Sequence, residues 1–150
     1  MDKIVLLDSG PLGIVTNPKA SPENESGRLW LQYLLSQNVN VIIPEITDYE
    51  VRRELQRGKK INGLKRLNEL KAALTYLPIN TATMLKAAEF WSKARQMGKK
   101  TASDDALDGD VILAAQAALL QNANNQIIVA TKNVKHLSLF VDAREWKSIK

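Results

Sequence analysis

The chain has 150 residues, of which 45% are hydrophobic and 25% charged, as expected for one ordinary domain with a core of its own. It contains no cysteine, which excludes thiol catalysis, zinc thiolate sites and disulfide bonds and fits a reducing compartment. No apolar stretch is long enough to cross a bilayer, and the apolar run near the N-terminus is too short for a signal peptide. We therefore expect a single domain over residues 1–150, in the cytoplasm and without membrane attachment.

The net charge of +5 is unevenly distributed along the chain. Basic residues gather between positions 52 and 71, where only Glu54 and Glu69 oppose them, whereas positions 103–110 carry aspartates and no basic residue. A basic surface beside an acidic pocket suits a polyanion whose phosphodiester is brought to a bound metal. The same charge pattern is also typical of two solvated helices.

Apolar strand-like runs alternate with helical patterns. Strands are predicted at residues 4–7, 39–43, 76–79 and 126–130, with a weaker one at 139–142. Helices are predicted after Ser21-Pro22, from Pro44 to about Arg57 before Gly58, over about 62–73, from Asn80 or Thr81 to Gly98, and over 111–120. This alternation predicts a parallel sheet with helices on both faces.

Two details of the second half of the chain bear on the site. In the helix after Asn80, Leu85, Ala88, Trp91 and Arg95 follow the helical period, and Trp91, like Trp30, is expected in the core. Residues 99–109 are expected to form a polar loop. Asp108 would then be the N-cap of the buried helix, with Asp110 in its first turn.

Carboxylates stand at the ends of predicted buried elements. Asp8 ends the first strand, and the ligand site of a parallel sheet lies at the carboxyl ends of its strands, where Asp110 can converge on it. A cap explains one aspartate of the pair Asp108 and Asp110, but a second carboxylate at a buried helix start is costly without a cation. Convergent carboxylates indicate a hard metal ion. Considered alone, Asp8 could equally cap a turn formed with Ser9 and Gly10.

The helix after Pro44 offers a third acid. Glu50 shares a helix face with Ile46, so it faces the same cleft if Ile46 packs inward. Glu45 or Asp48 could take this role instead, and Glu50 could also be a solvent-facing partner of a neighbouring arginine.

Four ordered blocks together resemble a PIN domain, and most closely its VapC-like branch. They are Asp8-Ser9-Gly10, Tyr49-Glu50-Val51, the run from Asp110 to Ala117, and the run from Ile128 to Asn133. The resemblance spans nearly the whole chain. It implies a three-layer α/β/α fold with a central parallel sheet of four to five strands. It also implies a Mg²⁺- or Mn²⁺-dependent endoribonuclease that cleaves RNA, often the toxin of a toxin–antitoxin pair and often a homodimer.

Carried over by position, the resemblance makes Asp8, Glu50 and Asp110 the catalytic residues and metal ligands. Asn133 stands where many members have a further acidic residue, so one charge is missing unless Asp108 or Asp105 supplies it. An asparagine can still coordinate a cation through its carbonyl oxygen.

The candidate substrate-binding residues fall into two groups. Ser9 and Thr131 could hydrogen-bond a scissile phosphate or a carboxylate, and each could equally be a turn residue. The basic group could hold RNA phosphates or dock an acidic antitoxin segment; its members are Arg52, Arg53, Arg57, Lys59 and Lys60. His136, the single histidine, is expected to be a surface residue.

Two other kinds of domain share part of this pattern. A haloacid-dehalogenase-type phosphatase needs a second aspartate where Gly10 stands, and a receiver domain needs its phosphoacceptor where Ile79-Asn80 stands. The serious alternative is a catalytically weakened PIN-like module that binds RNA or protein, because Asn133 replaces an acid.

Overall fold

The computed structural model describes residues 2–98 and 104–150, and only the backbone of residues 104–106. Within these ranges five parallel strands form one sheet in the order β3-β2-β1-β4-β5. The strands are β1 (Asp2–Leu7), β2 (Asn40–Pro44), β3 (Thr75–Leu77), β4 (Asn125–Thr131) and β5 (Ala143–Glu145). The predicted parallel sheet is confirmed.

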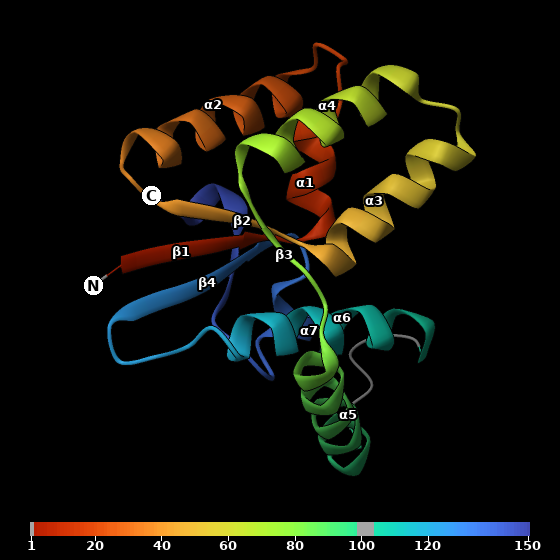
Figure 1. The fold of residues 1–150 in the computed structure, drawn as a ribbon, viewed down its shortest axis with the longest axis vertical. Coiled ribbons are helices and arrows are strands. Elements are labelled where there is room, and N and C mark those ends of the chain that lie inside the picture. Colours follow the sequence, from red (N-terminus) through yellow and green to blue (C-terminus); the bar gives the residue numbers. More distant parts are fainter. Residues whose placement is uncertain (1, 99–103) are drawn as a thin grey trace.

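Helices cover both faces of this sheet (Figure 1). They are α1 (Ser9–Thr16), α2 (Pro22–Ser36), α3 (Glu45–Arg57), α4 (Ile61–Ala73), α5 (Thr81–Gln96), α6 (Asp104–Ala118) and α7 (Val134–Leu137), with a 3-10 turn, η1 (Trp146–Ser148). Val5 and Leu7 of β1 pack with α1, α2 and α4, whereas Leu6 packs with α6 and α7 on the other face. The alternation of β1 side chains therefore divides the core into two halves, and the three-layer α/β/α architecture is confirmed.

Helix starts follow the capping signals in the sequence. Ser21 accepts a hydrogen bond from the Asn24 amide with Pro22 as first helical residue, and Asn80 accepts one from the Thr83 amide. Pro44 and Gly58 bound α3, as predicted. None of the helices described is long and apolar enough to span a membrane.

Helix α1 was not expected, because Ser9, Gly10 and Pro11 suggested a turn. The structure instead turns directly from β1 into a helix whose N-cap is Asp8. Pro11 is tolerated there because the amides of a first helical turn have no partner within the helix.

The last strand was predicted in the wrong place. β5 occupies Ala143–Glu145 rather than 139–142. The apolar residues at 139–142 lie in a turn and pack against the core from there. Phe140 stacks on Phe90 at 4.9 Å between ring centroids, and Val141 contacts the core. Burial rather than strand pairing accounts for their apolar character.

The polar loop expected at 99–109 is also wrong in its second half, because α6 begins at Asp104. Residues 99–103 lie outside the part of the chain that the structure describes. Asp108 is therefore an interior helical residue and not the N-cap. Asp110 lies beyond the first turn, where the helix dipole contributes little.

The apolar stripe predicted for α5 faces solvent. Leu85 is 67% exposed and Trp91 is 38% exposed, while Ala87 and Ala94 are buried against α6. Small residues make this contact because they let the two helices approach closely. The expected core position of Trp91 is thus wrong, whereas Trp30 is partly buried and its Nε1 donates to the Ile149 carbonyl at 3.0 Å.

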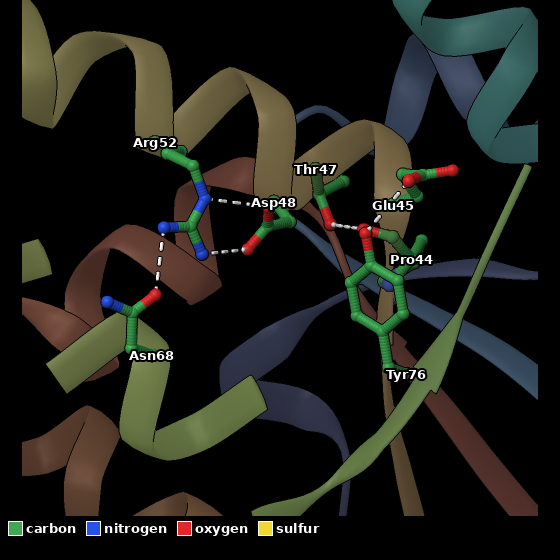
Figure 2. A network of polar contacts seen from close by, with 7 residues as sticks. All are labelled: Pro44, Glu45, Thr47, Asp48, Arg52, Asn68 and Tyr76. Atoms are coloured by element: carbon green, nitrogen blue, oxygen red, sulfur yellow. Dashed lines mark hydrogen bonds and ion pairs between the residues drawn. The ribbon is translucent and has the colours of Figure 1, made fainter. Parts of the chain in front are cut away.

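A polar network fixes α3, the helix that carries Glu50 (Figure 2). The guanidinium of Arg52 donates to both oxygens of buried Asp48 at 3.0 Å and to Asn68 of α4 at 2.8 Å. The Glu45 carboxylate accepts from the Tyr76 hydroxyl at 3.1 Å and from the Ile79 amide at 2.7 Å. Burial, followed by the bond to Glu45, raises the pKa of Tyr76 to about 12. The network ties α3 to α4 and to the β3 edge of the sheet.

Replacing Arg52 by alanine leaves the buried Asp48 carboxylate without its cation. We expect the free energy of unfolding to fall by about 2–4 kcal/mol in urea denaturation at pH 7. Arg57→Ala is the matched control, because Arg57 pairs with Glu54 on the surface and its loss should leave the free energy of unfolding nearly unchanged. Equal losses in the two variants would contradict a structural role for Arg52.

Candidate functional site

Asp8 lies at the carboxyl end of β1 and is 7% exposed. One of its oxygens accepts a hydrogen bond from the Ser9 amide at 2.7 Å, and the other accepts one from the Thr131 hydroxyl at 2.7 Å. The Thr131 oxygen in turn accepts from the Asn133 amide at 2.8 Å. Of the two roles expected for Thr131, the structure shows the bond to a carboxylate. Both oxygens of Asp8 are therefore held in place by neighbouring elements.

Glu50 and Asp110 converge on Asp8 from α3 and α6. Burial, together with the negative charges of Asp8 and Asp110, raises the pKa of Glu50 to about 7, and Arg53 partly opposes these effects. Burial and the Asp8 charge likewise raise the pKa of Asp110 to about 6, with His136 opposing. The structure thus brings together three acids that the sequence places far apart.

The other acids of α3 already have partners. Glu45 accepts from Tyr76 and Ile79, and Asp48 is held by Arg52. Glu54 pairs on the surface with Arg57. This leaves Glu50 as the α3 acid that faces Asp8, so the choice that the sequence left open between Glu45, Asp48 and Glu50 is decided by hydrogen bonding.

Gly109 allows Glu50 to approach α6. A Cβ atom at this position would lie 2.7 Å from Oε2 of Glu50, closer than such contacts occur. Sequence reasoning did not assign Gly109 a role, although a glycine inside a helix between two aspartates is a signal of close approach.

Of the further metal ligands expected from the sequence, Asp108 lies away from this group. Asp108 is exposed and lines a hollow against α5 with Met84 and Trp91, on another face of α6 from Asp110. Asn133 is exposed and is the N-cap residue of α7. The side chain of Asp105 lies outside the described part of the structure.

His136 is closer to the acids than its sequence context suggested. Its Nδ1 lies 3.6 Å from Oδ2 of Asp110, and its side chain is 30% exposed. The expected surface position is thus only partly right. No signal in the sequence pairs the two residues, because α7 meets α6 only through the tertiary fold.

The basic residues of α3 and the following turn have different surroundings. Arg52 and Arg57 are bound to acids, whereas Arg53 lies over the Tyr49 ring at 5.0 Å and beside Glu50. A cavity of about 760 Å³ between α1, α2, α3 and α4 is lined by Ser9 and Glu50 as well as by basic residues that include Lys19, Arg53 and Lys60. Lys59 is exposed, with a positive φ of 53°.

The donor chemistry of the three acids fits a hard divalent cation. All their side-chain ligands are oxygens, and burial and mutual repulsion leave Glu50 and Asp110 short of compensating charge. Among the side chains that the structure describes, no three acids or histidines lie close enough to hold an ion directly. A cation at this site would therefore bind some of these groups through water.

The raised pKa of Glu50 makes stability depend on pH in EDTA. The folded state binds more protons than the unfolded state between the ordinary value of 4.5 and about 7, so the free energy of unfolding falls as pH rises through this window. Glu50→Gln should weaken this fall and raise stability at pH 8 by about 1–2 kcal/mol, less than the full effect because the carboxylate is partly solvated.

Glu54→Gln is the control for this measurement. Its pKa is lowered by the hydrogen bond and charge of Arg57, so it titrates below the window and should leave the pH profile unchanged. Thermal denaturation from pH 5 to pH 8 makes the comparison. A parent protein whose stability rises over this range would contradict the charge repulsion at Glu50.

Solved structures share this fold. The chain aligns with one from VapBC2 of Rickettsia felis bound to a DNA fragment from their promoter, with a TM-score of 0.71, 16% identity and coverage of 94% of this chain and 97% of that chain. For FitAcB of Neisseria gonorrhoeae the TM-score is 0.69 at 23% identity, covering 97% and 99%. For VapBC-1 of nontypeable Haemophilus influenzae it is 0.65 at 17% identity, covering 97% and 99%. At these identities the likeness shows the fold alone.

At the level of sequence, no curated protein matches. The model of the PIN domain matches residues 20–136, which is more than half of the chain and includes Glu50 and Asp110. Together with the parallel sheet and the acids at its carboxyl edge, this match means that the chain belongs to the PIN domain family.

Proposed function

We propose that this protein is a Mg²⁺- or Mn²⁺-dependent endoribonuclease. PIN domains are generally nucleases. The observation that carries the proposal is the convergence of Asp8, Glu50 and Asp110. Burial and the repulsion between these acids raise the pKa values of Glu50 and Asp110, as expected for a site without enough compensating positive charge.

Asp8, Glu50 and Asp110 would hold the ion. When bound, a divalent cation supplies the Lewis acidity that activates water and neutralises charge on the phosphodiester. Asp8 is kept in one orientation by Ser9 and Thr131, so it is a fixed anchor for the ion. Glu50 of α3 and Asp110 of α6 would bind the ion as carboxylates, so that metal binding would release any protons they carry.

The substrate would enter along the cavity between α1 and α4. Lys19, Arg53 and Lys60 can contact phosphates there while Ser9 and Glu50 line the same space. Lys59 is exposed nearby in the chain and can add to this charge. Arg52 and Arg57 are left out of the proposal, because both are occupied by acids of α3.

The biological setting that we propose is a toxin–antitoxin pair with this chain as the toxin. Its similarity in fold to chains of the VapBC and FitAcB structures and the VapC-like sequence blocks support an antitoxin protein as partner. A module that binds RNA without cutting it remains the second candidate, favoured by the exposed Asn133 in place of an acid and by the wide spacing of the acids.

Cleavage of structured RNA in Mn²⁺ separates the two candidates. Asp110→Asn should lower the cleavage rate by roughly 100-fold or more, because it removes a ligand, and EDTA should abolish cleavage. Asp108→Asn is the matched control on another face of the same helix and should cut normally. Binding without cleavage would favour the module, and equal rates for both variants would remove Asp110 from the site.

We also propose that the protein forms a homodimer through α5. This helix packs inward with small residues, and Leu85 on its outer side is 67% exposed, while Met84 (48%) and Trp91 (38%) border the hollow against α6. Large exposed apolar side chains on one helix are typical of a protein–protein contact.

Leu85→Glu should convert the dimer to a monomer in light scattering at micromolar concentration, because a charge is then buried at the contact. The melting temperature of the Leu85→Glu monomer should stay close to that of the parent protein, since Leu85 contributes little to the core. Ile61→Glu on α4, where the residue is 77% exposed, is the control and should leave the mass unchanged. A monomeric parent protein would contradict the proposal.

A further inference from the structure

The imidazole of His136 lies beside the proposed metal ligands. His136 is the single histidine of the chain and lies on α7, one helical turn after the N-cap residue Asn133. Its Nδ1 is 3.6 Å from Oδ2 of Asp110, and the side chains are 30% and 19% exposed, respectively. Solvent and an ion can therefore reach the space between the two groups.

The distance between Nδ1 of His136 and Oδ2 of Asp110 is one that two ligand atoms of the same ion can have. A separation of 3.6 Å is longer than a hydrogen bond between nitrogen and oxygen. Two ligand atoms at about 2.0–2.2 Å from the same ion are roughly 3.0–3.6 Å apart, depending on the angle between them. A separation of 3.6 Å therefore fits two ligands of one ion, as well as a direct contact between the imidazole and the carboxylate.

The site also lacks one of the ligands that the resemblance implies, so a further ligand such as His136 can be accommodated. Asn133 follows β4 where the resemblance implies an acid, and it is exposed and neutral. Asp108, the other candidate for the missing ligand, lines a hollow against α5. His136 reaches the acids from the same short helix that Asn133 begins.

We propose that His136 is a direct ligand of the divalent ion together with Asp110, and that its imidazole gives the site a preference for Mn²⁺ or Co²⁺ over Mg²⁺. The proposal rests on the proposed metal-dependent function. Mg²⁺ prefers oxygen ligands, whereas imidazole nitrogen suits transition-metal ions. A site of carboxylates alone would lack this nitrogen-based preference.

Pulsed electron paramagnetic resonance of the full chain loaded with Mn²⁺ tests this directly. Because His136 is the single histidine, any imidazole ¹⁴N coupling to Mn²⁺ reports this residue alone. We expect the coupling in the parent protein and its loss in His136→Gln. Calorimetric titration should show about tenfold weaker Mn²⁺ binding in that variant and less than about a threefold change for Mg²⁺.

Lys135→Gln is the matched control, because Lys135 is the exposed neighbour of His136 on α7 and should leave the spectrum unchanged. Mn²⁺ bound through Asp8 and Asp110 but without nitrogen coupling would overturn the assignment of His136 and leave the proposed nuclease intact. No binding of Mn²⁺ by the parent protein would overturn both. The parent spectrum decides the matter even if His136→Gln does not fold.

Discussion

The hydrogen bonds of the Asp8 carboxylate are the constraint on which the site depends. They join the end of β1 to the start of α1 through Ser9 and to the end of β4 through Thr131. Because β1 and β4 are neighbours in the sheet, this one side chain links two strands and the first helix at the carboxyl edge of the sheet. A buried carboxylate with both oxygens bonded cannot move away from further negative charge, so other acids near it must bear the repulsion.

Glu50 is kept close to Asp8 by contacts that lie elsewhere on α3. The bonds of Arg52 to Asp48 and Asn68 hold one side of the helix, and the bond of Glu45 to Tyr76 holds its start (Figure 2). The Ile79 amide donates a further bond to Glu45. Gly109 then offers no side chain to push the Glu50 carboxylate away from α6. The repulsion at the site is thus balanced by a structural network whose own charges are paired.

The sequence predicted the layers and four of the strands because their apolar runs and caps are local signals. The convergence of Asp8 and Asp110 could be predicted for the same reason, since each of these residues adjoins an apolar run. Arg52 could not be placed from charge alone, although its spacing of four residues from Asp48 is the spacing of a helical ion pair. The approach of His136 to Asp110, the role of Gly109 and the exposed face of α5 arise from tertiary packing, which no local pattern records.

The start of α6 at Asp104 changes the electrostatic interpretation of Asp110. Two residues apart on a helix, Asp108 and Asp110 point roughly 200° from each other, so only one of them can face Asp8. Since Asp110 lies beyond the first turn, the helix dipole does not offset its charge, and among the described side chains His136 is the one that lowers the pKa of Asp110. The protein can hold these acids together either by keeping protons on them or by exchanging the protons for a cation, and the proposed nuclease requires the second state.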